Sequence, residues 1–279
     1  MKYGVFIFAT DQSIGVAEIA RAAEERGFES LWLPEHVHIP VARETPYPLS
    51  PDGVLPEMYK RTYDPFVALG VAAGVTGELR LGTGICLVTE RDPLVLAKEV
   101  ASLDRLSGGR FLFGIGAGWL REEMEVLGTR FNTRWKVAGE RIASMKTAWT
   151  EPEAEYRGEF VKFPKTFLFP KPIQKPHPPI LIGAGSRWAR QRVVDWDAHW
   201  IPNRTRPDFI EHGINDIRER AAAAGKDPER FNTTVFGPIE GALADYERMG
   251  VERCIFNLPS APAEQVLPEL DRVVALAGL

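Results

Sequence analysis

The stretch RFLFGIGAGWLREE, Arg110–Glu123, decides how the fold of this chain is predicted. An apolar run leads into Gly114, Gly116 and Gly118, and a tryptophan and acidic residues follow. Glycines directly after a strand let the backbone approach a phosphate or an aromatic ring closely. The stretch therefore fits a dinucleotide-binding turn, a flavin-type site on another fold, or a tight turn that binds nothing.

The surrounding sequence alternates short apolar runs with segments of helical pattern. Strict strand–helix alternation predicts a parallel sheet, and eight units in 279 residues fit an α/β fold of the (β/α)8 TIM-barrel type. A doubly wound sheet of nine or ten strands is the alternative, but nothing marks two halves or a linker. We therefore expect one domain over residues 1–279. The eight apolar runs are Tyr3–Phe8, Ser30–His36, Leu79–Val88, Arg110–Gly116, Pro179–Ser186, Asp197–Pro202, Asn232–Pro238 and Glu252–Pro259.

Helix boundaries are predicted from capping residues. Asp64–Pro65 and Asp92–Pro93 each combine an aspartate N-cap with a proline in the first helical position. Ser13 is the expected N-cap of the first helix, and Gly27 and Gly108 are expected to end helices.

Two segments lack periodicity. Residues 37–63 contain five prolines and are predicted to form a long loop that covers the active site. Residues 151–178 are aromatic and proline-rich, and we expect an excursion before the fifth strand, in the form of a small hairpin on the outside.

Composition excludes several classes of protein. A net charge of −4 provides no basic field for nucleic acid. The sequence contains no run of about 18 apolar residues, so no membrane span is expected. The N-terminal segment is typical of a strand rather than a signal peptide. A cytoplasmic protein is therefore expected. Cys86 and Cys254 lie in apolar runs and are expected to be buried free thiols.

The dinucleotide-turn hypothesis fails on spacing and position. The fingerprint is G-x-G-x-x-G in the first βαβ unit, followed about 20 residues later by an acid at a strand end. Here the spacing is G-x-G-x-G, three strands come first, and a helical segment occupies the place of the second strand end.

Glycine-rich turns follow three consecutive strands, at Gly82–Gly84, Gly114–Gly118 and Gly183–Ser186. Strand ends without side chains would form a flat wall along which a planar ring can lie. The third turn precedes a helix, whose free N–H groups suit a phosphate, and Arg187 adds positive charge there. Each turn alone is equally well explained by tight packing, but three neighbouring turns favour a cofactor site.

The second strand ends in Glu35, His36 and His38. His36 is a candidate proton donor, because the pKa of a free imidazole lies near neutrality; the alternative is a histidine that only bonds a loop carbonyl. A metal-dependent hydrolase would need further ligands at later strand ends, and these are missing, so no metal is expected. No G-x-S-x-G motif or cysteine–histidine pair supports nucleophilic hydrolysis.

Taken together, several motifs closely resemble the luciferase-like monooxygenase superfamily, and most closely its branch that uses the deazaflavin coenzyme F420. The resemblance runs in order through at least residues 1–200. It is carried by SLWLPEHVHIP, by LRLGTGICLVTERDPLVLAKEVASLDRLSGGRFLFGIGAGW, by REEMEVLG, by GERIASMKTAW and by PPILIGAGS.

The resemblance implies a barrel with an excursion before strand five, a homodimer, and a flavin-like ring at the carboxyl ends of the strands. Relatives have a cis non-proline peptide after LGT, which corresponds to Gly84–Ile85. Glu35 and His36 match an acid–histidine pair of the deazaflavin enzymes and are the expected catalytic residues. The expected cofactor-binding residues are Thr83, Gly84, Ile85, Gly116, Ala117, Gly118, Gly183, Ala184, Gly185 and Ser186.

The chain departs from the family pattern at one position. Some deazaflavin dehydrogenases have a catalytic glutamate shortly after the strand-four glycines, where this chain has Trp119, with Glu122 and Glu123 one helical turn later. A sugar-phosphate substrate is therefore not expected. Trp119, Glu123 and Asn203 are the predicted substrate-pocket residues.

The predicted function is F420-dependent hydride transfer to or from a small organic substrate. The alternatives are an FMN-dependent monooxygenase that uses O2 and a non-catalytic flavin-binding protein. An apolar substrate is expected, because the loop contains several large apolar side chains. These are Tyr47, Leu49, Leu55, Met58 and Tyr59.

Overall fold

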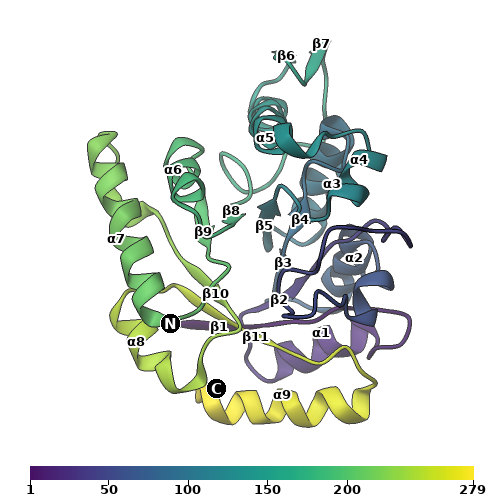
Figure 1. Cartoon of the computed structure of the whole chain (residues 1–279), viewed down its shortest axis with the longest axis vertical. Helices are drawn as coiled ribbons and strands as arrows, with labels where there is room; N and C mark the ends of the chain where they lie inside the picture. The colour runs from purple at the N-terminus through teal and green to yellow at the C-terminus, as the bar shows by residue number, and fades with distance from the viewer.

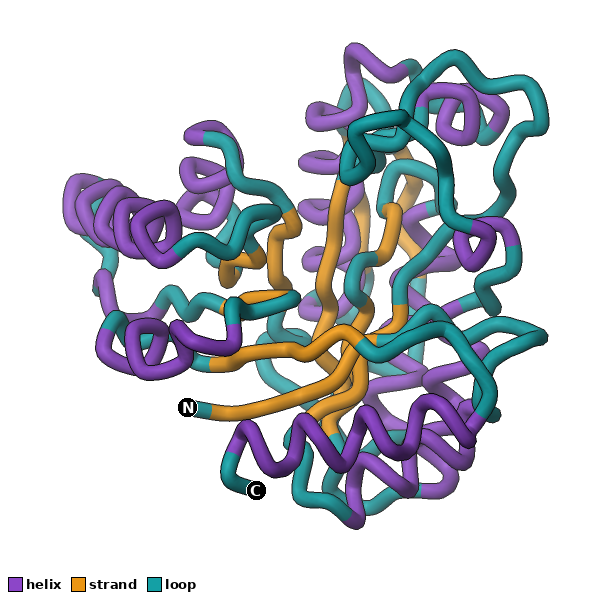
Figure 2. Tube along the Cα trace, turned by 60° about the horizontal axis from the view of Figure 1, so that its bottom comes forward, coloured by secondary structure: helices purple, strands orange, loops and turns teal.

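Short runs of buried apolar residues form the strands, as expected for parallel strands that are covered on both faces. The computed structural model describes all residues from 1 to 279. Figures 1 and 2 show the strands in the centre of the molecule with helices around them. The barrel strands are β1 (Lys2–Phe6), β2 (Ser30–Leu33), β3 (Arg80–Thr83), β4 (Cys86–Leu87), β5 (Phe111–Gly116), β8 (Ile180–Gly183), β9 (His199–Ile201), β10 (Thr234–Phe236) and β11 (Arg253–Asn257).

The strands follow the order β10-β11-β1-β2-β3-β5-β8-β9, and β4 extends the β3 position along β5. All pairings in this sheet are parallel; Gly4 lies opposite Ser30 of β2 and Ile255 of β11, for example. A parallel bridge between Trp200 and Thr233 links the two ends of the series. The result is the nearly closed eight-stranded barrel that the alternation of strands and helices predicts.

Helices follow the strands and form the outer layer (Figure 1). Asp64 and Asp92 each accept hydrogen bonds from two backbone amides at a helix start, as predicted. The Ser13 prediction is wrong: the first helix begins after Gly15, and the Ser13 hydroxyl accepts a hydrogen bond from the Thr10 amide instead. The helices are α1 (Val16–Glu25), α2 (Pro65–Val75), α3 (Pro93–Leu106), α4 (Arg121–Val126), α5 (Arg134–Thr150), α6 (Arg187–Asp195), α7 (Pro207–Ala223), α8 (Leu243–Arg248) and α9 (Ala263–Ala277).

Two hydrophobic clusters hold this arrangement together. The larger contains 59 buried residues, many of them from helix faces and the strands that they cover. The smaller fills the barrel interior and explains why the barrel is a packed core rather than a pore. Its buried residues are Trp32, Leu112, Leu181, Ile201 and Ile255.

The third predicted strand is interrupted. It consists of β3 and β4, and the peptide bond between Gly84 and Ile85, which joins them, is cis, as the family resemblance implied. The predicted excursion contains an antiparallel hairpin of β6 (Ala154–Arg157) and β7 (Lys162–Thr166), which projects beyond α5 in Figure 1. Between residues 37 and 63 the chain has one short 3-10 helix, Glu57–Lys60, and otherwise runs as an irregular loop.

Both cysteines are free and buried, as predicted. A search of the helices finds none that combines the length and the apolar character needed to cross a bilayer.

Candidate active site

His36 lies just beyond the carboxyl end of β2, at the mouth of the barrel. Its Nδ1 atom is 2.6 Å from Oε2 of Glu123, in the first turn of α4. The histidine side chain is 6% exposed and the glutamate side chain is fully buried. Because a carboxylate only accepts hydrogen bonds, Nδ1 carries a hydrogen. The other nitrogen, Nε2, has no protein partner and is not a buried atom, so it is free to meet a ligand.

Glu123 also fixes the start of the long loop. Its Oε1 accepts hydrogen bonds from the backbone amides of Val37, at 2.8 Å, and His38, at 3.3 Å. Charge-assisted bonds of this kind are stronger than neutral ones. The prediction placed Glu123 on the wall of the substrate pocket; the structure places it behind His36, where it orients the ring.

Glu35, predicted to be catalytic together with His36, bonds other residues in the structure. Its carboxylate accepts from the Leu87 amide at 2.6 Å and from Nε of Arg91 at 2.5 Å. Arg91 also bonds Asp64 and Glu99. Glu35 is thus held in a buried ion-pair network under the β4 strand, and its side chain is only 1% exposed.

The floor of the barrel mouth is apolar. Phe6, Ile85 and Phe236 pack on the interior cluster and remain partly exposed. The Phe6 and Phe236 rings meet edge to face with centroids 5.7 Å apart. A planar aromatic ligand would therefore meet hydrocarbon and ring edges at this surface rather than polar groups.

Ile85 covers two of the glycines that were expected to form a bare wall. A Cβ atom at Gly116 would lie 2.0 Å from Cδ1 of Ile85, and one at Gly183 would lie 2.9 Å from its Cγ2. These glycines make room for the isoleucine. The expected bare glycine surface is therefore lined by the Ile85 side chain.

Other predicted cofactor-binding residues lie beneath this surface. Thr83 is fully buried, and its hydroxyl donates to the Gly114 carbonyl at 2.7 Å. Ala117 is also buried. Gly118 has a φ of +75°, a conformation that favours glycine, and it leads the chain into α4.

The turn between β8 and α6 has free backbone amides. Ser186 caps α6 by accepting from the Ala189 amide, whereas the amides of Gly185, Ser186 and Trp188 have no acceptor within the protein. Asn203, predicted in the substrate pocket, lies over this turn: a Cβ atom at Gly185 would be 2.1 Å from its Oδ1. Free amides at a helix start are suited to an anion.

Aromatic side chains from the long loop surround His36. The Tyr47 and Tyr59 hydroxyls are 2.8 Å apart, and burial followed by this hydrogen bond raises the pKa of Tyr59. The His36 ring lies 5.2 Å from Tyr59 and 5.9 Å from Trp119 between centroids. Phe8, which sequence reasoning did not select, packs on Tyr59 at 4.5 Å. This group forms the apolar wall beside His36.

Glu122 ties the loop to α4 a second time, because its carboxylate accepts from the backbone amides of Glu44, at 2.7 Å, and Thr45, at 2.9 Å. Neighbouring carboxylates of α4 thus hold two separate parts of residues 37–63.

Glu90 is a buried acid that the sequence analysis did not select. It is 8% exposed, and neither of its carboxyl oxygens meets a hydrogen-bond donor. Burial, and then the negative charges of Glu123 and Glu35, raise its pKa to about 9. Its sequence context, Thr89-Glu90-Arg91-Asp92, resembles an ordinary surface turn, and its burial depends on residues from distant parts of the chain.

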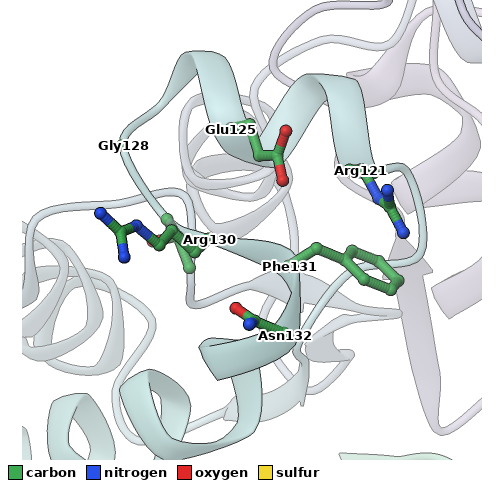
Figure 3. Close-up of a pocket in the computed structure, with 7 residues that line it drawn as sticks. Arg121, Glu125, Gly128, Arg130, Phe131 and Asn132 are labelled. Atoms are coloured by element: carbon green, nitrogen blue, oxygen red, sulfur yellow. The ribbon is translucent and has the colours of Figure 1, made fainter.

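A cleft of about 760 Å³ lies beside α4, where Arg121 and Glu125 face Phe131 and Asn132 (Figure 3). Arg121 and Arg134 stack on the Phe131 ring at 5.2 and 3.8 Å. The lining of this cleft does not include His36 or the barrel floor, so we place the candidate site at the barrel mouth.

Comparison with known proteins supports the same fold. A family model described as luciferase-like monooxygenase matches residues 1–240. An uncharacterized protein of Mycobacterium tuberculosis, Rv0953c, is 38% identical over 282 residues, which cover 99% of this chain and 98% of that protein. An FMNH(2)-dependent dimethylsulfone monooxygenase of Pseudomonas putida is 34% identical over 139 residues, 48% of this chain and 38% of that protein.

The structure of an F420-dependent secondary alcohol dehydrogenase superposes with a TM-score of 0.78 and 17% identity, and covers 99% of this chain and 98% of that one. At this identity the likeness concerns the fold.

Proposed function

The chain belongs to the luciferase-like monooxygenase family, and from this premise we propose that it is an oxidoreductase that uses coenzyme F420 for hydride transfer to or from a small apolar substrate. Both F420-dependent enzymes and flavin monooxygenases share this fold. The observation that supports hydride transfer with an accompanying proton is the geometry around His36, whose Nδ1 is held by Glu123 and whose Nε2 is free.

The residues at the barrel mouth fit a flavin-like coenzyme. Phe6, Ile85 and Phe236 offer an apolar floor for a planar ring. The free amides of Gly185 and Trp188 offer donors to an anionic group on the tail of such a coenzyme. The proposed ring site and the proposed anion site are both at the carboxyl ends of the barrel strands, where this fold binds its ligands.

F420 supplies or accepts a hydride when it is bound. The protein then has to manage the proton that accompanies the hydride. His36 supplies or takes this proton at Nε2, while Glu123 holds Nδ1 and fixes the orientation of the ring. Tyr59 and Trp119 exclude water beside the imidazole, and Glu122 keeps the covering loop in place.

Titration with F420 and with FMN, followed by fluorescence, tests this proposal. The matched variants are Ser186→Asp and Ser186→Asn, since both residues are good N-caps but only aspartate adds a negative charge beside the free amides. We expect F420 to bind the wild type and Ser186→Asn with similar Kd, and Ser186→Asp at least about 10-fold more weakly, a difference of about 1.4 kcal/mol. Tight FMN binding without F420 binding would overturn the choice of coenzyme.

An FMN-dependent monooxygenase is the second candidate, and the match to the Pseudomonas putida enzyme favours it. The two activities differ in their need for oxygen. Turnover with reduced FMN that consumes O2, together with no anaerobic turnover with F420, would establish the second candidate.

We also propose that the protein is a homodimer. The exposed face of α2 presents only apolar residues, Val67, Gly70, Val71 and Gly74, so the helix is apolar on every side. A helix of this kind is normally buried. The adjacent α3 adds exposed Val95, and a second copy of this chain is the occupant that the family resemblance implies.

A further inference from the structure

Glu90 is enclosed without any group that could stabilise its negative charge directly. It lies between β4 and α3, is 8% exposed, and no hydrogen-bond donor reaches Oε1 or Oε2. Burying an ionised carboxylate without donors costs several kcal/mol, so such a group takes up a proton instead. The absence of donors therefore indicates that Glu90 is protonated. A protonated carboxyl group is itself a hydrogen-bond donor.

Glu123 is the buried carboxyl group nearest in effect to Glu90, since its charge follows burial among the causes that raise the pKa of Glu90. Glu123 receives hydrogen bonds from His36 Nδ1 and from the amides of Val37 and His38. Two neighbouring buried carboxyl groups do not both ionise. Since Glu123 has three donors and Glu90 has none, the negative charge belongs on Glu123 and the proton on Glu90.

Other charges around Glu90 agree with this assignment. Glu35 adds a second nearby negative charge, although Arg91 largely balances it. Arg141 of α5 is the cation that favours ionised Glu90, but its guanidinium donates to the backbone carbonyls of Val88 and Arg91 at 2.9 and 2.7 Å. No cation reaches the carboxyl oxygens of Glu90 itself.

We propose that Glu90 is a neutral carboxylic acid that donates a hydrogen bond to Glu123 and thereby sets how strongly Glu123 holds His36. Glu90 is a positioning residue, since it acts through Glu123 and does not touch the ligand site. The chain Glu90–Glu123–His36 carries one negative charge instead of two. Its effect on the reaction rests on the proposed function of His36, but its protonation is a property of the protein without coenzyme.

The direction of the effect follows from electrostatics. A hydrogen bond from Glu90 spreads the charge of the Glu123 carboxylate and weakens its attraction for an imidazolium. Loss of that donor, or ionisation of Glu90, therefore strengthens the hydrogen bond that Glu123 accepts from Nδ1 of His36.

Carboxyl ¹³C NMR of glutamate-labelled protein without coenzyme tests the protonation state directly. We expect one glutamate signal of a protonated carboxyl at neutral pH, lost as the pH rises through about 9 and absent from Glu90→Gln. Glu125→Gln, an exposed change on α4, is the control and should retain the signal. If every glutamate of the wild type is ionised at neutral pH, or if the signal persists in Glu90→Gln, the proposal is wrong.

The ¹H NMR signal of the hydrogen on His36 Nδ1 tests the coupling, because this signal moves downfield as its hydrogen bond to Glu123 strengthens. Glu90→Gln keeps a donor to Glu123, so the signal should match the wild type at neutral pH but should not move at alkaline pH, where Glu90 of the wild type ionises. Glu90→Leu removes the donor and should move the signal downfield at neutral pH. Identical signals in all three proteins at every pH would overturn the coupling.

These measurements need no coenzyme. Failure of F420 to bind would refute the proposed function and leave the protonation of Glu90 to be judged on the NMR spectra alone.

Discussion

The imidazole Nδ1 of His36 lies 2.6 Å from a carboxylate oxygen of Glu123, although 87 positions separate the two residues in the chain. One residue follows β2 and the other follows β5, with β3 between these strands. The same carboxylate bonds the amides of Val37 and His38, so it positions the ring and the backbone beside it together.

Glu123→Gln is expected to lower kcat for F420-dependent turnover by about 100-fold, the lower end of the contribution of a positioned acid or base. Glutamine still accepts the loop amides but no longer balances a charged imidazole, so KM should change less. Steady-state kinetics with any substrate that is turned over measure this. His36→Ala should lose at least as much, and the double variant little more, because the two residues act as a unit.

Glu125→Gln is the control for this change, since Glu125 lies on the same helix and is exposed. A Glu123→Gln enzyme with the kcat of this control would show that the carboxylate does not serve His36.

Glu35→Gln is expected to affect stability far more than coenzyme binding. Glutamine still accepts from the Leu87 amide, but it leaves the half-buried Arg91 with only Asp64 and Glu99. Breaking a buried pair costs about 3–5 kcal/mol, and the two remaining partners reduce this to about 2 kcal/mol. Urea unfolding measures the loss. A Glu35→Gln variant that is as stable as the wild type but no longer turns over substrate would instead show that Glu35 has a catalytic role.

The fold was predictable because barrel strands and helices leave strong local signals. Buried runs such as SLWL in β2 and the Asp64 and Asp92 caps specify their elements without help from distant residues. The prediction of Ser13 as an N-cap was wrong because a serine before a helix can instead accept a hydrogen bond within the preceding turn, here from the Thr10 amide. The cis bond after Gly84 interrupts a strand that is continuous in its apolar pattern.

The candidate site was only partly predictable. His36 was found because strand ends carry the chemistry of this fold. The orientation of the Glu35 side chain depends on Arg91, which lies 56 positions away in the sequence. It could therefore not be deduced from the residues next to Glu35. Phe6 and Phe236 were missed because their position at the mouth depends on the register of the closed barrel. Glycines at the strand ends suggested a surface without side chains, but the Ile85 side chain fills the space beside Gly116 and Gly183.

Gly116→Ala is expected to weaken coenzyme binding by displacing Ile85. The new methyl group would lie 2.0 Å from Cδ1 of the isoleucine, which has to move toward the floor on which the ring is proposed to lie. A loss of about 1.4 kcal/mol, or 10-fold in Kd, is a reasonable size for this rearrangement. Fluorescence titration with F420 measures it.

Ile85→Val removes the Cδ1 atom and is the matched partner for this change. In the Gly116→Ala/Ile85→Val double variant, we expect most of the lost affinity to return, which is a positive coupling in a double-mutant cycle. Strictly additive losses would mean that Gly116 matters for a reason other than contact with Ile85.

Val71→Asp is expected to convert the proposed homodimer into a monomer. Val71 lies on the exposed apolar face of α2, and burying a carboxylate there without a partner costs several kcal/mol. Light scattering coupled to size-exclusion chromatography gives the mass. Val126→Asp changes another exposed valine, at the end of α4, and should leave the mass unchanged. A wild type that is already monomeric at micromolar concentration contradicts the proposal.

The raised pKa of Glu90 predicts how stability depends on pH. In the unfolded chain this carboxyl titrates near 4.5, and in the folded protein near 9. Between these values the folded state holds a proton that unfolding releases. The contribution of Glu90 is therefore fully present below about pH 4.5, and it is lost as the pH rises, by about 1.4 kcal/mol per unit at most, until about pH 9.

Glu90→Gln cannot release this proton, so its free energy of unfolding should lack that slope. The difference in unfolding free energy between Glu90→Gln and the wild type should grow in favour of the variant between about pH 5 and pH 9 and then level off. Urea unfolding at a series of pH values measures the difference, and Glu125→Gln should run parallel to the wild type. Parallel curves for Glu90→Gln and the wild type would mean that Glu90 is ionised in the folded protein, and that Glu123 does not hold its proton in place.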